Sequence, residues 1–209
     1  MVLEIVKYGD PVLRAKGQPV QRFDEDLRHL VDDMIETMYA SNGLGLAAQQ
    51  IGLALQLTVV DVAQVQQDRP STMSVDGQLA DLAEWMPLAL VNPRLELATE
   101  RVQGNEGCLS FPDIHGEVQR ATKITVNAQR LDGSELVFEA TGMLARALQH
   151  EVDHLHGVLF TDRMDSATKA SLAPRLKRLQ REGAENPTKG KPRPASGRPI
   201  AAAPSKGEP

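Results

Sequence analysis

The nine residues QHEVDHLHG (149–157) constrain this chain most, because they place two histidines four residues apart in a segment with helical patterning. Residues i and i+4 share one face of an α-helix, one turn apart. The imidazoles of His150 and His154 can therefore bind one metal ion, and Glu151 can reach a water molecule that the ion holds. The same pattern also arises by chance in helices that bind no metal. His156 lies outside the pair and is expected at the surface.

The only cysteine of the chain supplies a candidate third ligand. Cys108 lies in QGNEGCLSFP, in a glycine-containing turn between two expected strands. A lone cysteine is usually a small buried hydrophobe, but glycines permit a backbone that presents a thiolate outward. A Cys-His-His set with a water in the fourth position suits zinc, iron, nickel or cobalt. One cysteine forms no internal disulfide, so nothing indicates an oxidising compartment.

The segment NGLGLAAQQIG (42–52) is rich in glycine and carries two adjacent glutamines. Glycines let a backbone approach a ligand closely, and a side-chain amide can donate to a developing oxyanion. The alternative is a simple connection between a helix and a strand, with solvated glutamines. The segment contains neither a G-x-G-x-x-G fingerprint nor a P-loop lysine.

Together, GLGLAAQQ, EGCLS and QHEVDHL, in this order and at these separations, resemble the signature motifs of the bacterial peptide deformylases. The N-terminal YGDPVLRAKGQPV is also similar to the opening segment of that family, so the resemblance covers residues 2–163. It implies a hydrolase that removes the formyl group from the N-terminal methionine of newly made polypeptides and releases formate. It also implies one divalent metal ion. Fe²⁺ is the expected native ion, and Ni²⁺, Co²⁺ or Zn²⁺ are the alternatives.

The resemblance further implies a role for each motif residue. The implied metal ligands are Cys108, His150 and His154. Glu151 would act as general base toward the metal-bound water that attacks the formyl carbon, and then as acid toward the leaving amine. The amide of Gln50 and the backbone N–H of Leu109 would bind the formyl oxygen, and the backbone of Gly45 would contact the substrate.

A second group of residues is expected around the methionine side chain. These pocket residues are Leu44, Met143, Arg146, Ala147 and His115. Many family members carry arginine near the position of His115, which is equally well explained as an ordinary loop residue, and core packing is the alternative for Ala147. Glu106 and Arg120 are expected as an ion pair, either supporting the metal loop or lying at the surface.

Hydrophobic patterning predicts an α+β fold. Helices are expected at 23–40 and 142–157. Strands are expected at 55–62, at 88–98 and in a hairpin at 122–140 that turns at Asp132-Gly133. Mostly antiparallel strands would then pack around the central metal-binding helix, with an N-terminal helix and a C-terminal extension.

The chain divides into three expected parts. Residues 1–165 would form the catalytic domain, 166–182 a basic helix, and 183–209 a disordered tail rich in Pro, Gly and Ala. Within the first part, the polar segment 63–87 is expected to be a surface insertion with a short helix around LADLAEWM (79–86).

Charge and composition limit the partners. The net charge of −5 argues against bulk nucleic-acid binding, although five basic residues of the C-terminal helix could contact ribosomal RNA: Lys169, Arg175, Lys177, Arg178 and Arg181. A solvated helix is the alternative. The sequence shows no signal peptide and no apolar run long enough to span a bilayer, which predicts a cytoplasmic protein without membrane contact. It predicts no particular oligomeric state.

Two other functions are alternatives to deformylation. A zinc protease also uses H-E-x-x-H, but its third ligand would be a downstream His or Glu, and no histidine follows His156. A non-catalytic relative that binds ribosomes or nascent chains would tend to lose the base or a ligand, whereas Glu151, Gln50 and Cys108 are all present.

Overall fold

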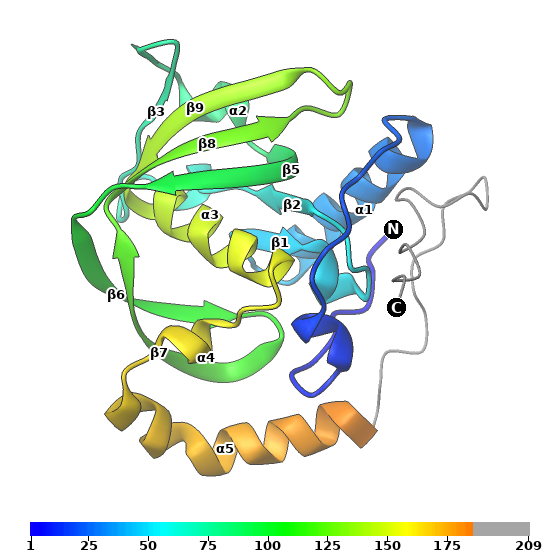
Figure 1. Cartoon of the computed structure of the whole chain (residues 1–209), viewed down its shortest axis with the longest axis vertical. Coiled ribbons are helices and arrows are strands. Elements are labelled where there is room, and N and C mark those ends of the chain that lie inside the picture. Colours follow the sequence, from blue (N-terminus) through cyan, green and yellow to red (C-terminus); the bar gives the residue numbers. More distant parts are fainter. Residues whose placement is uncertain (186–209) are drawn as a thin grey trace, which may run out of the picture.

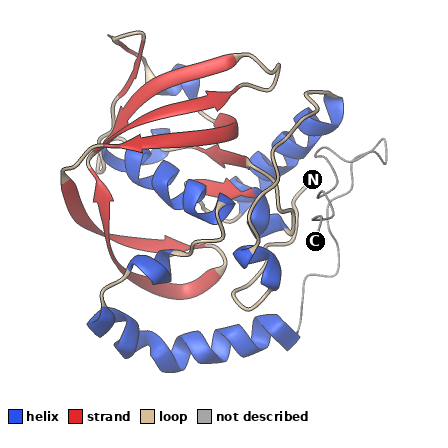
Figure 2. Ribbon diagram, in the orientation of Figure 1, coloured by secondary structure: helices blue, strands red, loops and turns tan. Residues whose placement is uncertain are grey.

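The computed structural model describes residues 1–185 and shows two antiparallel sheets (Figures 1 and 2). The larger sheet has seven strands, in the order β1 (Gly45–Ala47), β2 (Leu57–Val60), β5 (Leu88–Leu97), β8 (Lys123–Gln129), β9 (Glu135–Thr141), β3 (Met73–Val75) and β4 (Gln78–Leu79). The smaller sheet is a long hairpin of β6 (Arg101–Cys108) and β7 (Phe111–Ala121). The α+β fold with antiparallel strands is confirmed.

Helix α3 (Gly142–Leu155) lies between the two sheets and contacts strands of both (Figure 1). On one side Leu144, Ala145 and Leu148 join the aliphatic core of the larger sheet. The helix begins at Gly142, whose φ is +62° and where an added Cβ would lie 2.0 Å from the Pro70 carbonyl oxygen. Only glycine tolerates both conditions, and this fixes where the motif helix begins.

Helix α1 (Glu25–Ala40) covers β1 and β2 and confirms the expected N-terminal helix. The Asp24 side chain caps it by accepting the Leu27 N–H, which satisfies one of the free donors at a helix start. Its apolar face is buried in a core cluster with both strands through Leu27, Leu30, Val31, Met34 and Met38. The segment before it contains a 3₁₀ turn, η1 (Pro11–Arg14), and is otherwise an extended arm.

The segment 63–87 is more than a surface insertion, so that expectation is wrong in part. Its strand β3 pairs with β9 and brings the fully buried Met73 into the core. Strand β4 then forms the outer edge of the larger sheet, after a tight turn. A 3₁₀ turn, η3 (Ala63–Val65), precedes them, and the expected short helix is present as α2 (Leu82–Trp85).

The C-terminal part consists of α4 (Phe160–Arg163) and α5 (Ser166–Glu185). Helix α5 packs against β7, below the hairpin in Figure 1, and buries Leu176. The helix extends three residues past the expected end at 182. The expected disorder of the tail falls on 186–209, outside the described residues. No helix within 1–185 has the length and apolar character needed to cross a membrane.

Candidate active site

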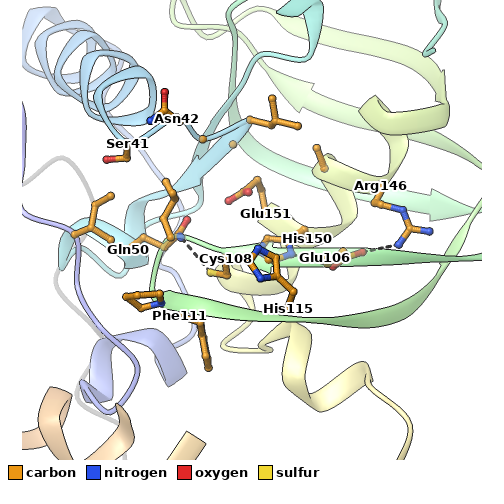
Figure 3. Close-up of a pocket in the computed structure, with 18 of the residues that line it drawn as sticks. Ser41, Asn42, Gln50, Glu106, Cys108, Phe111, His115, Arg146, His150 and Glu151 are labelled. Atoms are coloured by element: carbon orange, nitrogen blue, oxygen red, sulfur yellow. Dashed lines mark hydrogen bonds and ion pairs between the residues drawn. The ribbon is translucent and has the colours of Figure 1, made fainter. Parts of the chain in front are cut away.

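Helix α3 and the end of β6 bring together three side chains that could hold a metal ion. Two of them, Cys108 and His150, are labelled in Figure 3. His150 and His154 lie one turn apart on α3, with ring centroids 5.0 Å apart. Cys108 ends β6, and its Sγ lies 3.3 Å from Nε2 of His154. The ligand atoms of all three residues lie within 4.8 Å of one another, so one small cation can contact all three.

The surroundings of the two histidines differ. Nδ1 of His150 lies 3.0 Å from Oε2 of Glu106, which orients the ring and leaves Nε2 for the metal. Desolvation and the nearby His150 lower the pKa of His154 well below its ordinary value. Desolvation would lower the pKa of His150, but its hydrogen bonds with Cys108 and Glu106 raise this pKa well above its ordinary value. A metal ion takes the place of the His150 proton when it binds, because a neutral imidazole is the form that binds metals.

Glu106 is the centre of a buried ionic network behind the metal ligands. Arg120 donates to both of its carboxylate oxygens at 2.9 Å, and Arg146 donates to Oε1 at 2.8 Å. Burial alone would raise the pKa of Glu106, but hydrogen bonds from Arg120 and His150 outweigh it and lower the pKa to about 2. The expected Glu106–Arg120 pair is therefore a buried support of the metal loop, not a surface pair.

Arg146 has its charge in this network and only its stem at the pocket. Besides Glu106, the guanidinium donates to three backbone carbonyls of the hairpin, those of Val102, Gly104 and Val118. An added Cβ at Gly104 would lie 2.8 Å from Nη2 of Arg146, so glycine there makes room for the guanidinium. This joins α3 to both strands of the hairpin.

Glu151 lies buried beside the metal ligands and faces β1 (Figure 3). Desolvation raises the pKa of Glu151 to about 7, and its buried Oε2 has no hydrogen-bond partner among the described residues. A carboxyl group with a pKa near the working pH can both take and give a proton. An added Cβ at Gly45 would lie 2.4 Å from Oε1 of Glu151, so only glycine leaves room for this carboxylate.

Gln50 lies in η2 (Ala48–Ile51), and its side-chain amide points toward Cys108. Its Oε1 accepts the Ala47 N–H at 2.8 Å, which turns Nε2 toward Cys108 Sγ at 3.4 Å (Figure 3). Leu109 follows Cys108 and lines the same cavity, and its carbonyl accepts a hydrogen bond from Lys7 Nζ. The amide donor and the metal-binding atoms therefore face one space.

A cavity of about 500 Å³ opens in front of these groups. All five pocket residues expected from sequence line it: Leu44, Met143, Arg146, Ala147 and His115. Sequence reasoning missed other lining residues, among them Arg69, Asn105, Ile5 and Phe111. Asn105 and Phe111 lie in the segment QGNEGCLSFP around Cys108 and could have been found by their nearness to it, whereas only tertiary packing brings Ile5 and Arg69 to the cavity.

Comparison with known proteins decides the family. A family model described as "Polypeptide deformylase" matches residues 2–170. The chain belongs to the peptide deformylase family. The peptide deformylase of Methylacidiphilum infernorum is 43% identical over 181 residues, covering 87% of this chain and 94% of that protein. That of Opitutus terrae is 45% identical over 181 residues, covering 86% and 93% respectively.

Solved structures agree with this assignment. The crystal structure of the peptide deformylase from Thermotoga maritima superposes with a TM-score of 0.68 at 38% identity, covering 79% of this chain and 99% of that one. The chain is therefore a metal-dependent hydrolase of protein biosynthesis that removes the N-formyl group from the N-terminal methionine of nascent polypeptides. The expected resemblance and enzyme class are confirmed.

Proposed function

We propose that Cys108, His150 and His154 hold one Fe²⁺ ion as the native metal of this deformylase. The thiolate and two imidazoles form a donor set that also accepts Ni²⁺, Co²⁺ or Zn²⁺. When bound, the ion supplies Lewis acidity that polarises the formyl oxygen and lowers the pKa of water. Metal analysis of protein purified without oxygen tests the assignment, and a predominance of zinc at full activity would overturn it.

Glu151 serves as the proton carrier in this proposal. Its carboxylate takes the proton of the water that attacks the formyl carbon and then donates it to the nitrogen of the departing amine. A raised pKa near 7 supports both steps, because neither protonation state is strongly favoured at neutral pH. Gly45 leaves the space in which the carboxylate stands, and its backbone borders the substrate.

Gln50 and the backbone N–H of Leu109 stabilise the negative charge that develops on the formyl oxygen. The support is the orientation of Gln50, since the hydrogen bond from Ala47 to Oε1 leaves Nε2 as the end that faces the cavity. Donors fixed in advance stabilise a transition state without reorganisation, and loss of one typically costs about 10²- to 10³-fold in rate.

The methionine side chain occupies the part of the cavity beside α3. Its walls are Leu44, Met143, Ala147 and the stem of Arg146, which present carbon atoms to a thioether. His115 borders the mouth, where its ring can donate to the peptide backbone of the substrate. This leaves the charge of Arg146 outside the methionine site, bound to Glu106.

The observation that carries the proposal is that Cys108, His150 and Glu151 line one cavity, while the ligand atom of His154 lies within 4.8 Å of those of Cys108 and His150. Formate release from a formyl-Met tripeptide tests it, beside the same peptide without the formyl group and an unformylated protein substrate. A deformylase releases formate from the first and cuts neither of the others. Cleavage of internal peptide bonds would favour the protease instead.

The placement of the enzyme follows from its substrate. Nascent formylated chains emerge at the ribosome, so we assign residues 1–165 as a catalytic domain of the cytoplasm and the helix at 166–182 as a ribosome contact. Several basic side chains of α5 are exposed, among them Lys177, Arg178 and Arg181. Co-sedimentation with ribosomes tests this: binding should weaken steeply with salt and in a variant with these three changed to glutamine.

A further inference from the structure

The cavity continues past the methionine site into a second depression. Met143, Arg146, Asn105 and Arg69 line both the cavity and this neighbouring groove between α3 and β6. Because the two depressions share these lining residues, a chain that continues from a methionine held against Met143 can enter the groove. The groove is therefore placed to contact the chain that follows the methionine.

The exposed charge of the groove comes from one side chain. Arg120 and Arg146 also line it, but both are buried and paired with Glu106. No acidic residue lines the groove, and no hydrogen bond or ion pair joins the exposed guanidinium of Arg69 to another side chain within residues 1–185. Arg69 is thus an uncompensated cation at the rim.

The backbone around Arg69 holds it in place. Its N–H donates to the Val65 carbonyl at 2.8 Å, and the next residues are joined to Gln66, whose side chain bonds both the N–H and the carbonyl of Ser71. Ser71 in turn accepts the Leu144 N–H at the start of α3. The segment 63–87 therefore fixes Arg69 relative to the catalytic helix.

We infer that Arg69 is a specificity residue that favours formylated chains with an acidic side chain soon after the methionine. A carboxylate at the second or third residue of the substrate would pair with the guanidinium, whereas a lysine there would be repelled. This inference rests on the proposed function. Exposed ion pairs are weak, so a preference of roughly two- to fivefold in kcat/KM is expected for Glu over Gln, and again for Gln over Lys.

The test compares formyl-Met-Glu-Ala, formyl-Met-Gln-Ala and formyl-Met-Lys-Ala by formate release from the metal-loaded enzyme. The wild type should rank them Glu, Gln, Lys, and the differences should shrink as salt is added. Arg69→Gln should level the three, and Arg69→Glu should reverse the order. Arg94→Gln is the matched control, because Arg94 is exposed on β5 and lines neither depression.

The outcomes distinguish a failure of the specificity role of Arg69 from a failure of the proposed deformylase function. Equal kcat/KM for the three peptides in the wild type, or an unchanged ranking in Arg69→Glu, would overturn the specificity role while leaving the deformylase intact. If Arg94→Gln levels the ranking as well, overall charge and not Arg69 sets it, which also overturns the inference. No formate from any of the peptides would instead contradict the proposed function.

Discussion

At the scale of single residues, Glu106 connects the hairpin to the metal-binding helix. Its buried carboxylate binds two arginines and the Nδ1 side of His150. Removing one partner of a buried ionic network leaves the others uncompensated, which costs more than the pair contributed. The orientation of His150, one of the three proposed metal ligands, thus depends on a carboxylate outside that ligand set.

Glu106→Gln should weaken metal binding. The substitution keeps the shape but removes the charge that orients His150, and loss of such a supporting partner typically costs about 10- to 100-fold in metal affinity. Competition with a chelator measures the affinity directly. Glu135→Gln, at an exposed site on β9, is the control, and equal affinity of the two variants would contradict the account.

Gly45→Ala should nearly abolish turnover while the protein still folds. The new methyl group would meet the Glu151 carboxylate at 2.4 Å and displace it. A displacement of about 1 Å at a catalytic group costs on the order of 10²-fold in rate. Gly77→Ala is the control: its Cβ meets no atom within 4 Å, so the strain at its φ of +76° should lower the stability of the fold without lowering turnover. Formate release at saturating substrate measures the turnover of both variants. Normal turnover by Gly45→Ala would contradict the claim that glycine is needed to leave space for the Glu151 carboxylate.

At the scale of elements, contacts at the end of α1 fix the glycine-rich segment of the cavity. The Tyr39 hydroxyl donates to Asp61, which follows β2, and the Asp61 N–H donates to the Leu44 carbonyl. These two hydrogen bonds join the end of α1 and the end of β2 to the cavity wall at Leu44. Partial burial and the Asp61 carboxylate raise the pKa of Tyr39 to about 12.

The ionisation of Tyr39 should therefore occur late in an alkaline titration. Because the pKa is higher in the folded protein than the ordinary value of about 10, this pair stabilises the fold below that pH and loses its effect as pH rises toward 12. The phenolate absorbance of Tyr8→Phe, which leaves Tyr39 as the only tyrosine, should give a midpoint near 12. Adding Asp61→Asn should lower it, and a midpoint near 10 before that change would refute the pair.

Helix α5 contributes stability away from the reacting groups. Leu176 is buried against the apolar cluster of β7 and α4. Leu176→Ala should cost about 2–3 kcal/mol, equivalent to a fall of about 4–12 °C in Tm for a chain of this size. Exposed Lys177→Ala on the same helix should change neither. Thermal unfolding measures the effect, and a loss of deformylation at 25 °C in the still-folded Leu176→Ala protein would contradict the separation.

At the scale of the whole molecule, the features that could be predicted from the sequence are those encoded by neighbouring residues. Features that depend on contacts between distant segments could not be predicted. The helix spacing of His150 and His154, the turn at Asp132-Gly133 and the apolar spacing of the helix expected at 23–40 are encoded within a few residues, and all three features are present. The pairing of β3 with β9 depends on contacts between distant segments, so polar composition concealed it. The same reason explains why Arg69 was missed.

The roles within the site are the central claim, and one comparison tests them most directly. Formate release from a formyl-Met tripeptide should be measured for oxygen-free, iron-loaded wild type and Glu151→Gln, with the bound metal counted in both. We expect both proteins to keep one ion per chain and the variant to lose activity by about 10²- to 10⁴-fold, as for loss of a general base. Wild-type turnover by a metal-loaded Glu151→Gln would contradict the account.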